Sequence, residues 1–183
     1  AASDVYKRQL WDKKNRSLTD WSGRKTVIVD VDDVLARFRT GFFDWLNSNF
    51  DLNLTTEYPE YYFSGPVGHM TGEEAFSKFI EENGFRNLKV NNTVSESLKA
   101  LQEKGYWIQL LTARPHDSLK CMYDTYWWLS KNDIPYNSIS FSFEKFRWLS
   151  DKPFYLENKV VAAIDDSPKH AAEYACLLYT SPS

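Results

Sequence analysis

An apolar run that ends abruptly in three carboxylates constrains this chain more than any other feature. Residues 27–35 read VIVDVDDVL. A run rich in β-branched residues is typical of a buried parallel strand, and open α/β sheets place their ligand sites at the carboxyl edge of such strands. Side chains two apart on a strand point the same way, so Asp30 and Asp32 are expected to face one site. Two carboxylates that close need a cation or a shared proton, which suggests metal-assisted acid chemistry.

Length and composition bound the classes of protein to which the chain can belong. Its 183 residues suffice for one domain with a small insert, and a hydrophobic content of 43 % with 16 % aromatic residues supplies a sizeable core. The formal net charge of −3 argues against tight binding of a nucleic-acid polymer. No apolar run approaches the roughly 18 residues of a membrane span, and no secretory signal peptide is visible. Two cysteines make no disulfide framework, so we expect a cytoplasmic protein with no membrane partner.

The two ends of the chain look foreign to the rest. Residues 4–9 are what GAT-GTG-TAT-AAG-AGA-CAG encodes, and residues 176–181 are what TGT-CTC-TTA-TAC-ACA-TCT encodes. These strings are essentially reverse complements and resemble a transposon-type sequencing adapter read through at both ends. Residues 1–9 and 176–183 are therefore interpreted as adapter-derived tails and set aside from the fold. The native protein is expected to continue past residue 175, so that its C-terminal part is missing.

Between these tails, strands and helices alternate. Residues 10–25 form a polar extension with no clear period, and the predicted strands cover 26–31, 106–112, 138–143 and 159–164. Helices are predicted over 35–49, 73–82, 93–104 and 117–131, with others opening near Lys145 and at Pro168. Thr71 and Glu74 make a capping signal for the second of these helices, and Asp33 is placed to cap the first. In the helix over 117–131, Met122, Tyr126 and Leu129 are expected to point inward.

This order predicts the fold class. Strands that alternate with helices indicate an α/β fold with a doubly wound parallel sheet, here over residues 26–175. A small helical cap, at about residues 36–92, is inserted directly after the first strand. The loop-rich stretch 51–69 within it contributes four clustered aromatic residues, Tyr58, Tyr61, Tyr62 and Phe63. Most aromatic side chains of the insert are expected to form its own core.

Polar groups stand at the ends of all four predicted strands, and their order resembles the haloacid dehalogenase (HAD)-like hydrolase superfamily, with its Rossmann-like core. The first motif of that superfamily, D-x-D-x-[TV] after an apolar strand, matches residues 30–34. The second, a strand that ends in Thr or Ser, matches Thr112, and the fourth, paired acids after a strand, matches Asp165 and Asp166. The third is a lone lysine, for which Lys145 is the first choice and Lys152 and Lys159 are the alternatives. The resemblance covers residues 25–175.

Within that superfamily the chain looks most like the 5′(3′)-deoxyribonucleotidase branch. The residues that carry this likeness are DVDDVLA at 30–36, the aromatic helix through Phe42 and Phe43, and IDDSP at 164–168. One position departs from the pattern, because the branch usually has Gly where this chain has Asp33.

The resemblance implies a Mg²⁺-dependent phosphatase that acts on a small phosphate monoester. Asp30 would be the nucleophile that forms an aspartyl-phosphate, and Asp32 would protonate the leaving alkoxide and then activate water. Asp30, the backbone carbonyl of Asp32 and Asp165 would bind Mg²⁺, with Asp166 orienting the waters of the metal. Thr112 and Lys145 would hold the phosphate oxygens. The substrate pocket is predicted to include Phe38 and Phe42, which could stack on a nucleobase, and Arg114, which could touch phosphate.

Other functions stay open at this point. A polynucleotide end phosphatase would use the same chemistry, although the chain has no basic stripe. A non-enzymatic phospho-acceptor domain also gathers acids with Thr and Lys on a doubly wound sheet, and an inactive HAD-like fragment is the fourth possibility. The three histidines, His69, His116 and His170, are interpreted as ordinary surface residues that no spacing groups into a metal site.

Overall fold

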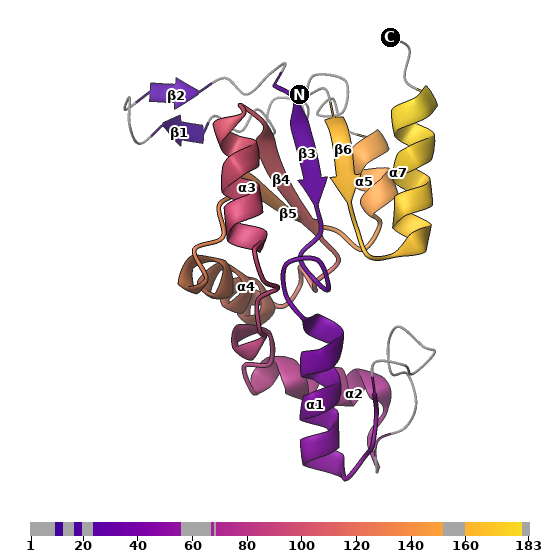
Figure 1. The fold of residues 1–183 in the computed structure, drawn as a ribbon. Helices are drawn as coiled ribbons and strands as arrows, with labels where there is room; N and C mark the ends of the chain where they lie inside the picture. The colour runs from indigo at the N-terminus through magenta and orange to yellow at the C-terminus, as the bar shows by residue number, and fades with distance from the viewer. Residues whose placement is uncertain are drawn as a thin grey trace.

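A four-stranded parallel sheet forms the centre of the molecule (Figure 1). The computed structural model describes residues 10–12, 17–19, 24–55, 67, 69–151 and 160–180. The sheet has the order β5-β4-β3-β6, with β3 at Thr26–Val29, β4 at Trp107–Thr112, β5 at Ser138–Phe141 and β6 at Val160–Ile164. All three strand pairs are parallel. The predicted fold class is therefore confirmed. The strand that precedes the acidic motif, β3, lies inside the sheet between β4 and β6.

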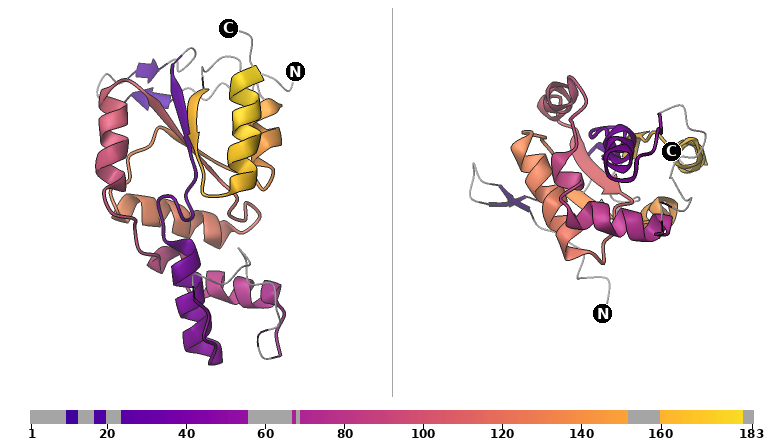
Figure 2. Two further views of the ribbon diagram at one scale, coloured as in Figure 1. Left: turned by 45° about the vertical axis from the view of Figure 1, so that its right-hand side comes forward. Right: turned by 90° about the horizontal axis from the view of Figure 1, so that it is seen from below.

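Helices cover both faces of this sheet, because successive side chains of a strand point to opposite faces. Val27 and Val29 pack in a core with α3 (Val94–Glu103) and α4 (Leu119–Lys131). Ile28 packs in a second core with α5 (Lys145–Ser150) and α7 (Pro168–Thr180). Figure 2 shows the same division, with α3 and α4 on one side of the sheet and α5 and α7 on the other. Both faces of β3 are thus buried, which explains its unbroken apolar sequence.

The insert after β3 forms the cap below the sheet (Figures 1 and 2). It contains α1 (Phe38–Phe50), α2 (Gly72–Glu81) and the short 3-10 helix η2 (Phe85–Asn87). Six aromatic rings pack between these elements, with neighbouring centroids 5.0–6.4 Å apart, and they belong to Phe38, Phe42, Trp45, Phe76, Phe79 and Phe85. Aromatic pairs of this kind contribute about 0.5–1.5 kcal/mol each beyond their burial. The four aromatic residues predicted at 58–63 lie outside the described residues.

The chain leaves and re-enters the sheet layer through two segments that lie side by side. Ala36 forms an antiparallel bridge with Val90, and the Arg37 N–H donates to the Lys89 carbonyl at 2.8 Å. On the other side of this bridge, the Asn91 N–H donates to the Leu35 carbonyl, also at 2.8 Å. We call this pairing the neck of the cap.

Local sequence signals account for the starts of two helices. Thr71 and Glu74 form the complete capping box at the start of α2, and Pro168 is the first residue of α7, as predicted. The first cap helix begins at Phe38 rather than at residue 35, because residues 31–36 form a tight turn. In that turn, the N–H groups of Leu35 and Ala36 both donate to the Val31 carbonyl, at 2.9 and 2.8 Å.

Two predictions about the elements are wrong. The side chain of Tyr126 in α4 is 42 % exposed instead of pointing inward, and the buried face of this helix consists of Cys121, Asp124, Thr125, Trp128 and Leu129. The burial of two polar residues, Asp124 and Thr125, displaced the apolar pattern on which the prediction rested. The polar extension also contains an unexpected antiparallel pair, β1 (Leu10–Asp12) with β2 (Ser17–Thr19).

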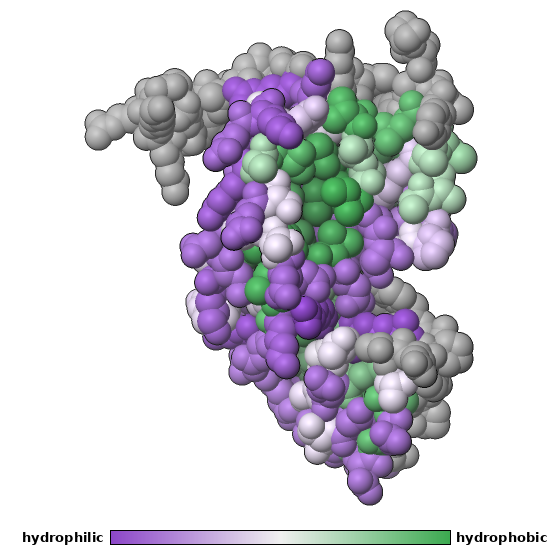
Figure 3. All heavy atoms as spheres, viewed as in Figure 1, coloured by the Kyte–Doolittle hydropathy of each residue, from purple (hydrophilic) through white to green (hydrophobic). Residues whose placement is uncertain are grey.

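The surface carries one noticeable apolar region. Figure 3 shows it on the viewed face, between α3 and α7. Two residues of β6, Val161 and Ile164, are each 44 % exposed. None of the helices in the part of the chain that the structure describes is long and apolar enough to cross a membrane.

Candidate active site

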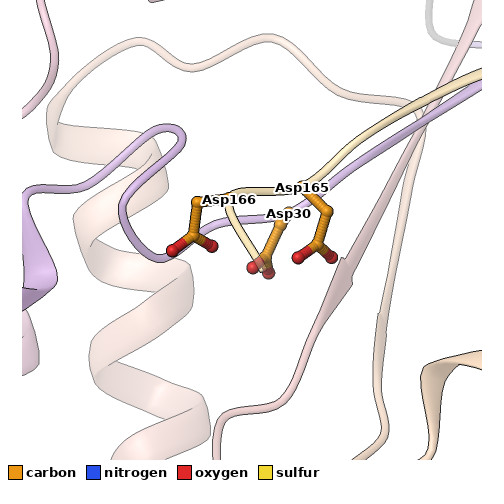
Figure 4. A group of neighbouring side chains, drawn as sticks. All are labelled: Asp30, Asp165 and Asp166. Carbon is orange, nitrogen blue, oxygen red and sulfur yellow. The ribbon is translucent and has the colours of Figure 1, made fainter. Parts of the chain in front are cut away.

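Three carboxylates meet where β3 and β6 end. Asp30 directly follows β3, and its backbone N–H donates to the Ile164 carbonyl at 2.9 Å, which fixes the two strand ends against each other. Asp165 and Asp166 directly follow β6. The three residues offer carboxylate oxygens that all lie within 4.8 Å of one another. Figure 4 shows the carboxylates side by side, pointing the same way from the two strand ends.

Lys145 supplies a positive charge to this cluster. Its Nζ lies 2.8 Å from Asp30 Oδ1 and 2.8 Å from Asp165 Oδ2, so that one ammonium bridges carboxylates from two strands. Its side chain is 1 % exposed, which is unusual for lysine and requires such partners. Lys145 opens α5, so the helix start places it at the edge of the sheet. The alternatives, Lys152 and Lys159, lie outside the described residues.

Burial shifts the ionisation of Asp30. Loss of solvent around its side chain raises the pKa to about 7, and the charges of Asp32 and Asp165 act in the same direction. The ion pair with Lys145 opposes this shift without overcoming it. A cation bound beside Asp30 would favour its ionised form, so metal and proton compete for this group.

The donor set of this cluster fits a hard divalent cation. Carboxylate oxygens are the ligands that Mg²⁺ and Ca²⁺ prefer, and Mg²⁺ typically uses one or two of them together with water and phosphate. The cluster contains three carboxylates and the one ammonium of Lys145. When all three carboxylates are ionised, a divalent cation would balance the negative charge that Lys145 leaves uncompensated. Asp30, Asp165 and Asp166 are therefore the residues that could hold the metal. The contribution of the Asp32 carbonyl stays a prediction.

Asp32 is held by Arg114, which follows β4. The Arg114 Nη2 lies 2.7 Å from Asp32 Oδ1 and its Nε lies 2.9 Å from Oδ2, so the two side chains form a bidentate ion pair. The Asp32 side chain is 16 % exposed, whereas that of Arg114 is fully buried. The structure thus pairs Arg114 with the second acid of the motif, and its predicted contact with phosphate stays a prediction.

Thr112 lies at the end of β4 and is fully buried. Its hydroxyl accepts the backbone N–H of Arg114 at 3.2 Å, so it stabilises the turn that carries the arginine. Its predicted contact with phosphate oxygens stays a prediction.

A cavity of about 840 Å³ opens between this acidic edge and the cap. Such a volume is typical of small-molecule sites. Asp30, Asp32, Asp165, Asp166, Lys145 and Arg114 line its polar end. Phe38 and Phe42 of α1 also line the cavity, and their contact with a substrate stays a prediction.

Sequence reasoning missed several lining residues. Phe76 of α2, Phe85 of η2 and Phe143 after β5 add aromatic wall, and Glu73 adds a carboxylate from the start of α2. These residues come from separate elements, and no spacing along the chain relates them to the acidic motif. His170 also lines the cavity, and its Nδ1 lies 3.3 Å from Asp165 Oδ1. Its position in the first turn of α7, directly after the paired acids, is the signal that could have indicated it.

Several solved structures share the architecture of this chain. The chain is similar to a hydrolase from Streptococcus pneumoniae TIGR4, with a TM-score of 0.51 and 15 % identity over 86 % of this chain and 94 % of that one. It is also similar to a HAD-superfamily hydrolase of subfamily IA, variant 1, from Geobacter sulfurreducens PCA, with a TM-score of 0.53 and 14 % identity over 84 % of both chains. At these identities the likeness shows the fold, which is that of HAD-superfamily hydrolases.

A third structure, of the Pnkp1/Rnl/Hen1 RNA repair complex, matches with a TM-score of 0.49 and 16 % identity over 89 % of this chain. This chain spans 45 % of the length of that one. No protein-family profile matches the sequence, and no curated protein is significantly similar to it.

Proposed function

We propose that the chain is a Mg²⁺-dependent phosphatase that hydrolyses a small phosphate monoester through an aspartyl-phosphate. The observation that carries this proposal is the cluster of Asp30, Asp165 and Asp166 with the buried Lys145, at the edge of a HAD-like sheet and in the lining of the cavity beneath the cap. A bound Mg²⁺ would neutralise phosphate charge and align the phosphorus with its nucleophile.

The residues of the chain then divide the reaction into two displacements. In the first, an Asp30 oxygen forms a bond to phosphorus while the bond from phosphorus to the ester oxygen breaks, and Asp32 gives that oxygen its proton. In the second, water attacks the phosphorus of the aspartyl-phosphate, its proton returns to Asp32, and Asp30 is released. Lys145 is placed to stabilise the charge on the phosphoryl oxygens and to hold Asp30 in line.

The cavity favours a substrate with one phosphate and a flat apolar group. Among the described residues that line it, the strongly basic ones are Lys145 and Arg114, and both already pair with carboxylates. The far end is aromatic, and base–aromatic stacking contributes about 1–3 kcal/mol per base. We therefore propose a nucleoside monophosphate, in line with the deoxyribonucleotidase-like motifs, ahead of a polynucleotide end, whose further phosphates would face Glu73 instead of basic groups.

Phosphate release from a substrate panel tests this function. The panel contains p-nitrophenyl phosphate, the nucleoside 5′- and 3′-monophosphates, phosphoserine and an oligonucleotide with a 3′-phosphate. We expect release in Mg²⁺ and none in EDTA, with activity lost in Asp30→Asn and kept in Asp44→Asn, an exposed aspartate of α1.

Four results would contradict the assignment or change it. Release that survives Asp30→Asn, or no release from any substrate, refutes the phosphatase. A persistent aspartyl-phosphate without turnover indicates a phospho-acceptor domain. Preference for the oligonucleotide over every monophosphate indicates an end phosphatase.

A further inference from the structure

We propose that Arg114 is a positioning residue that holds Asp32 in the orientation needed for proton transfer to the leaving group. This inference rests on the proposed phosphatase function and assigns a role to a residue outside the four motifs. Arg114 reaches both oxygens of the Asp32 carboxylate, with Nη2 to Oδ1 at 2.7 Å, Nε to Oδ2 at 2.9 Å and Nε to Oδ1 at 3.2 Å. A planar guanidinium that binds a carboxylate in this way fixes the plane of the carboxylate as well as its position.

The arginine is itself fixed from three other directions. Its Nη1 donates to Thr125 Oγ1 at 3.0 Å, and the Thr125 hydroxyl donates to the Cys121 carbonyl at 2.7 Å within α4. The guanidinium carbon lies 4.3 Å from the centre of the Phe85 ring, which comes from the cap. The backbone N–H of Arg114 donates to Thr112 Oγ1. The guanidinium is thus in contact with α4 and the cap as well as with Asp32, while its backbone is tied to the end of β4.

The hydrogen-bond pattern leaves one acceptor site of the Asp32 carboxylate unoccupied by Arg114. An ionised carboxylate offers about four lone-pair sites. Arg114 occupies both sites of Oδ1 and one of Oδ2, so one site on Oδ2 remains. The exposed fraction of this side chain, 16 %, faces the cavity, whereas Arg114 is fully buried. Arg114 thus fixes the plane of the Asp32 carboxylate and leaves part of it facing the cavity.

This arrangement predicts a dependence on the leaving group. When the phosphorus–oxygen bond breaks, the electron pair goes to the ester oxygen. An alkoxide needs the Asp32 proton at that moment, whereas p-nitrophenolate is stable without it. A variant that misplaces Asp32 therefore slows alkyl phosphates far more than p-nitrophenyl phosphate. A residue that binds phosphate would instead affect both substrates equally.

The test compares kcat and KM for p-nitrophenyl phosphate and benzyl phosphate in Arg114→Lys and Thr125→Val. Lysine keeps the positive charge and loses the fork, and valine removes the hydroxyl that orients Arg114 while keeping its shape. We expect kcat for benzyl phosphate to fall about 10²-fold more than kcat for p-nitrophenyl phosphate in Arg114→Lys, with KM little changed, and a smaller selective loss in Thr125→Val. Adding Arg114→Lys to Asp32→Asn should cause no further selective loss, because both changes remove the same step.

Arg86 provides the matched control. It forms an ion pair with Asp124 of α4, the helix that also carries Thr125, at 2.6 and 3.0 Å. Neither residue lines the cavity. Arg86→Lys should lower stability and change kcat for the two substrates by the same factor.

Equal losses of kcat on both substrates, or a raised KM alone, would overturn the positioning role and indicate phosphate binding. If Arg114→Lys does not fold, Thr125→Val decides between these results. A wild type inactive on the whole panel refutes the phosphatase itself, whereas an active wild type with an unselective variant refutes only this inference.

Discussion

Burial raises the pKa of two side chains, Asp30 and Cys121, with different consequences for their reactivity. Asp30 lies at a strand end that opens into the cavity, and its pKa of about 7 leaves it ready to ionise when a cation binds. Cys121 is fully buried on the inner face of α4, where loss of solvent raises the pKa of its thiol from 9.0 to about 12. The positive charge of Arg114 opposes this shift only in part. Burial therefore leaves Asp30 beside the cavity, where it can bind a cation, and keeps the Cys121 thiol protonated and unreactive.

The Cys121 thiol is expected to resist alkylation in the folded protein. At pH 8, iodoacetamide should modify the exposed Cys176 and leave Cys121 unmodified, because the thiolate is the reactive form. In urea both cysteines should react, and mass spectrometry of peptides distinguishes them. Since the folded pKa lies above the unfolded one, the protonated thiol stabilises the fold fully below about pH 9, and this contribution is lost as the pH rises toward 12. Equal labelling of both cysteines under native conditions would contradict this description.

The turn between β3 and α1 shows how one residue can serve two elements. Asp33 has a left-handed backbone with φ of 55°, a conformation in which glycine carries no penalty. Its carboxylate also accepts the backbone N–H of Arg39 in the first turn of α1, at 3.0 and 3.2 Å. The deoxyribonucleotidase motif that the sequence resembles usually has Gly here. Compared with glycine, Asp33 adds backbone strain and supplies a hydrogen bond to the first turn of α1.

Substitutions at Asp33 should separate these two contributions. Asp33→Gly loses the cap and relieves the backbone, whereas Asp33→Ala loses the cap and keeps the strain. We expect the free energy of unfolding in urea to fall in the order wild type, Gly, Ala, with about 1 kcal/mol between the two variants.

Asp51 is the matched position for this series, because it ends the same helix with φ of 52°. Asp51→Gly should leave stability unchanged or raise it, since the backbone is relieved and no cap is removed. An Asp33→Ala variant as stable as Asp33→Gly would show that the left-handed turn carries no cost.

The elements that sequence could predict are those with local signals. The strand over residues 26–29, the capping box at Thr71 and the helix that starts at Pro168 all follow from neighbouring residues. The doubly wound sheet follows from their order. The ion pair of Asp32 with Arg114 joins residues 82 positions apart, and the aromatic wall combines α1, α2 and η2. Such contacts depend on how elements pack in three dimensions, and no periodicity along the chain encodes them.

The proposed site is built from two parts of the molecule, the carboxyl edge of the sheet and the cap. The edge gathers charged groups from strands far apart in sequence, and the cap closes the cavity with aromatic side chains. The charged end is poised for a cation, because three carboxylates face one ammonium.

Mg²⁺ is therefore expected to stabilise the folded chain. A ligand that binds only the native state adds about 2.7 kcal/mol at one hundred times its dissociation constant. The midpoint of thermal unfolding should rise when EDTA is replaced by excess Mg²⁺, and Asp165→Asn should abolish most of this rise while Asp44→Asn keeps it. An equal rise in Asp165→Asn and wild type would place the cation elsewhere.

The neck at Ala36 and Val90 has an evolutionary consequence. Because the two crossing segments pair with each other, residues inserted or deleted between them change the cap without moving the ends of the strands. A lineage can thus lengthen, shorten or replace this module and acquire new substrates, while the acids at the edge of the sheet are inherited unchanged. Selection for substrate range can then act on the cap, except at positions such as Phe85 that also contact the charged end of the site.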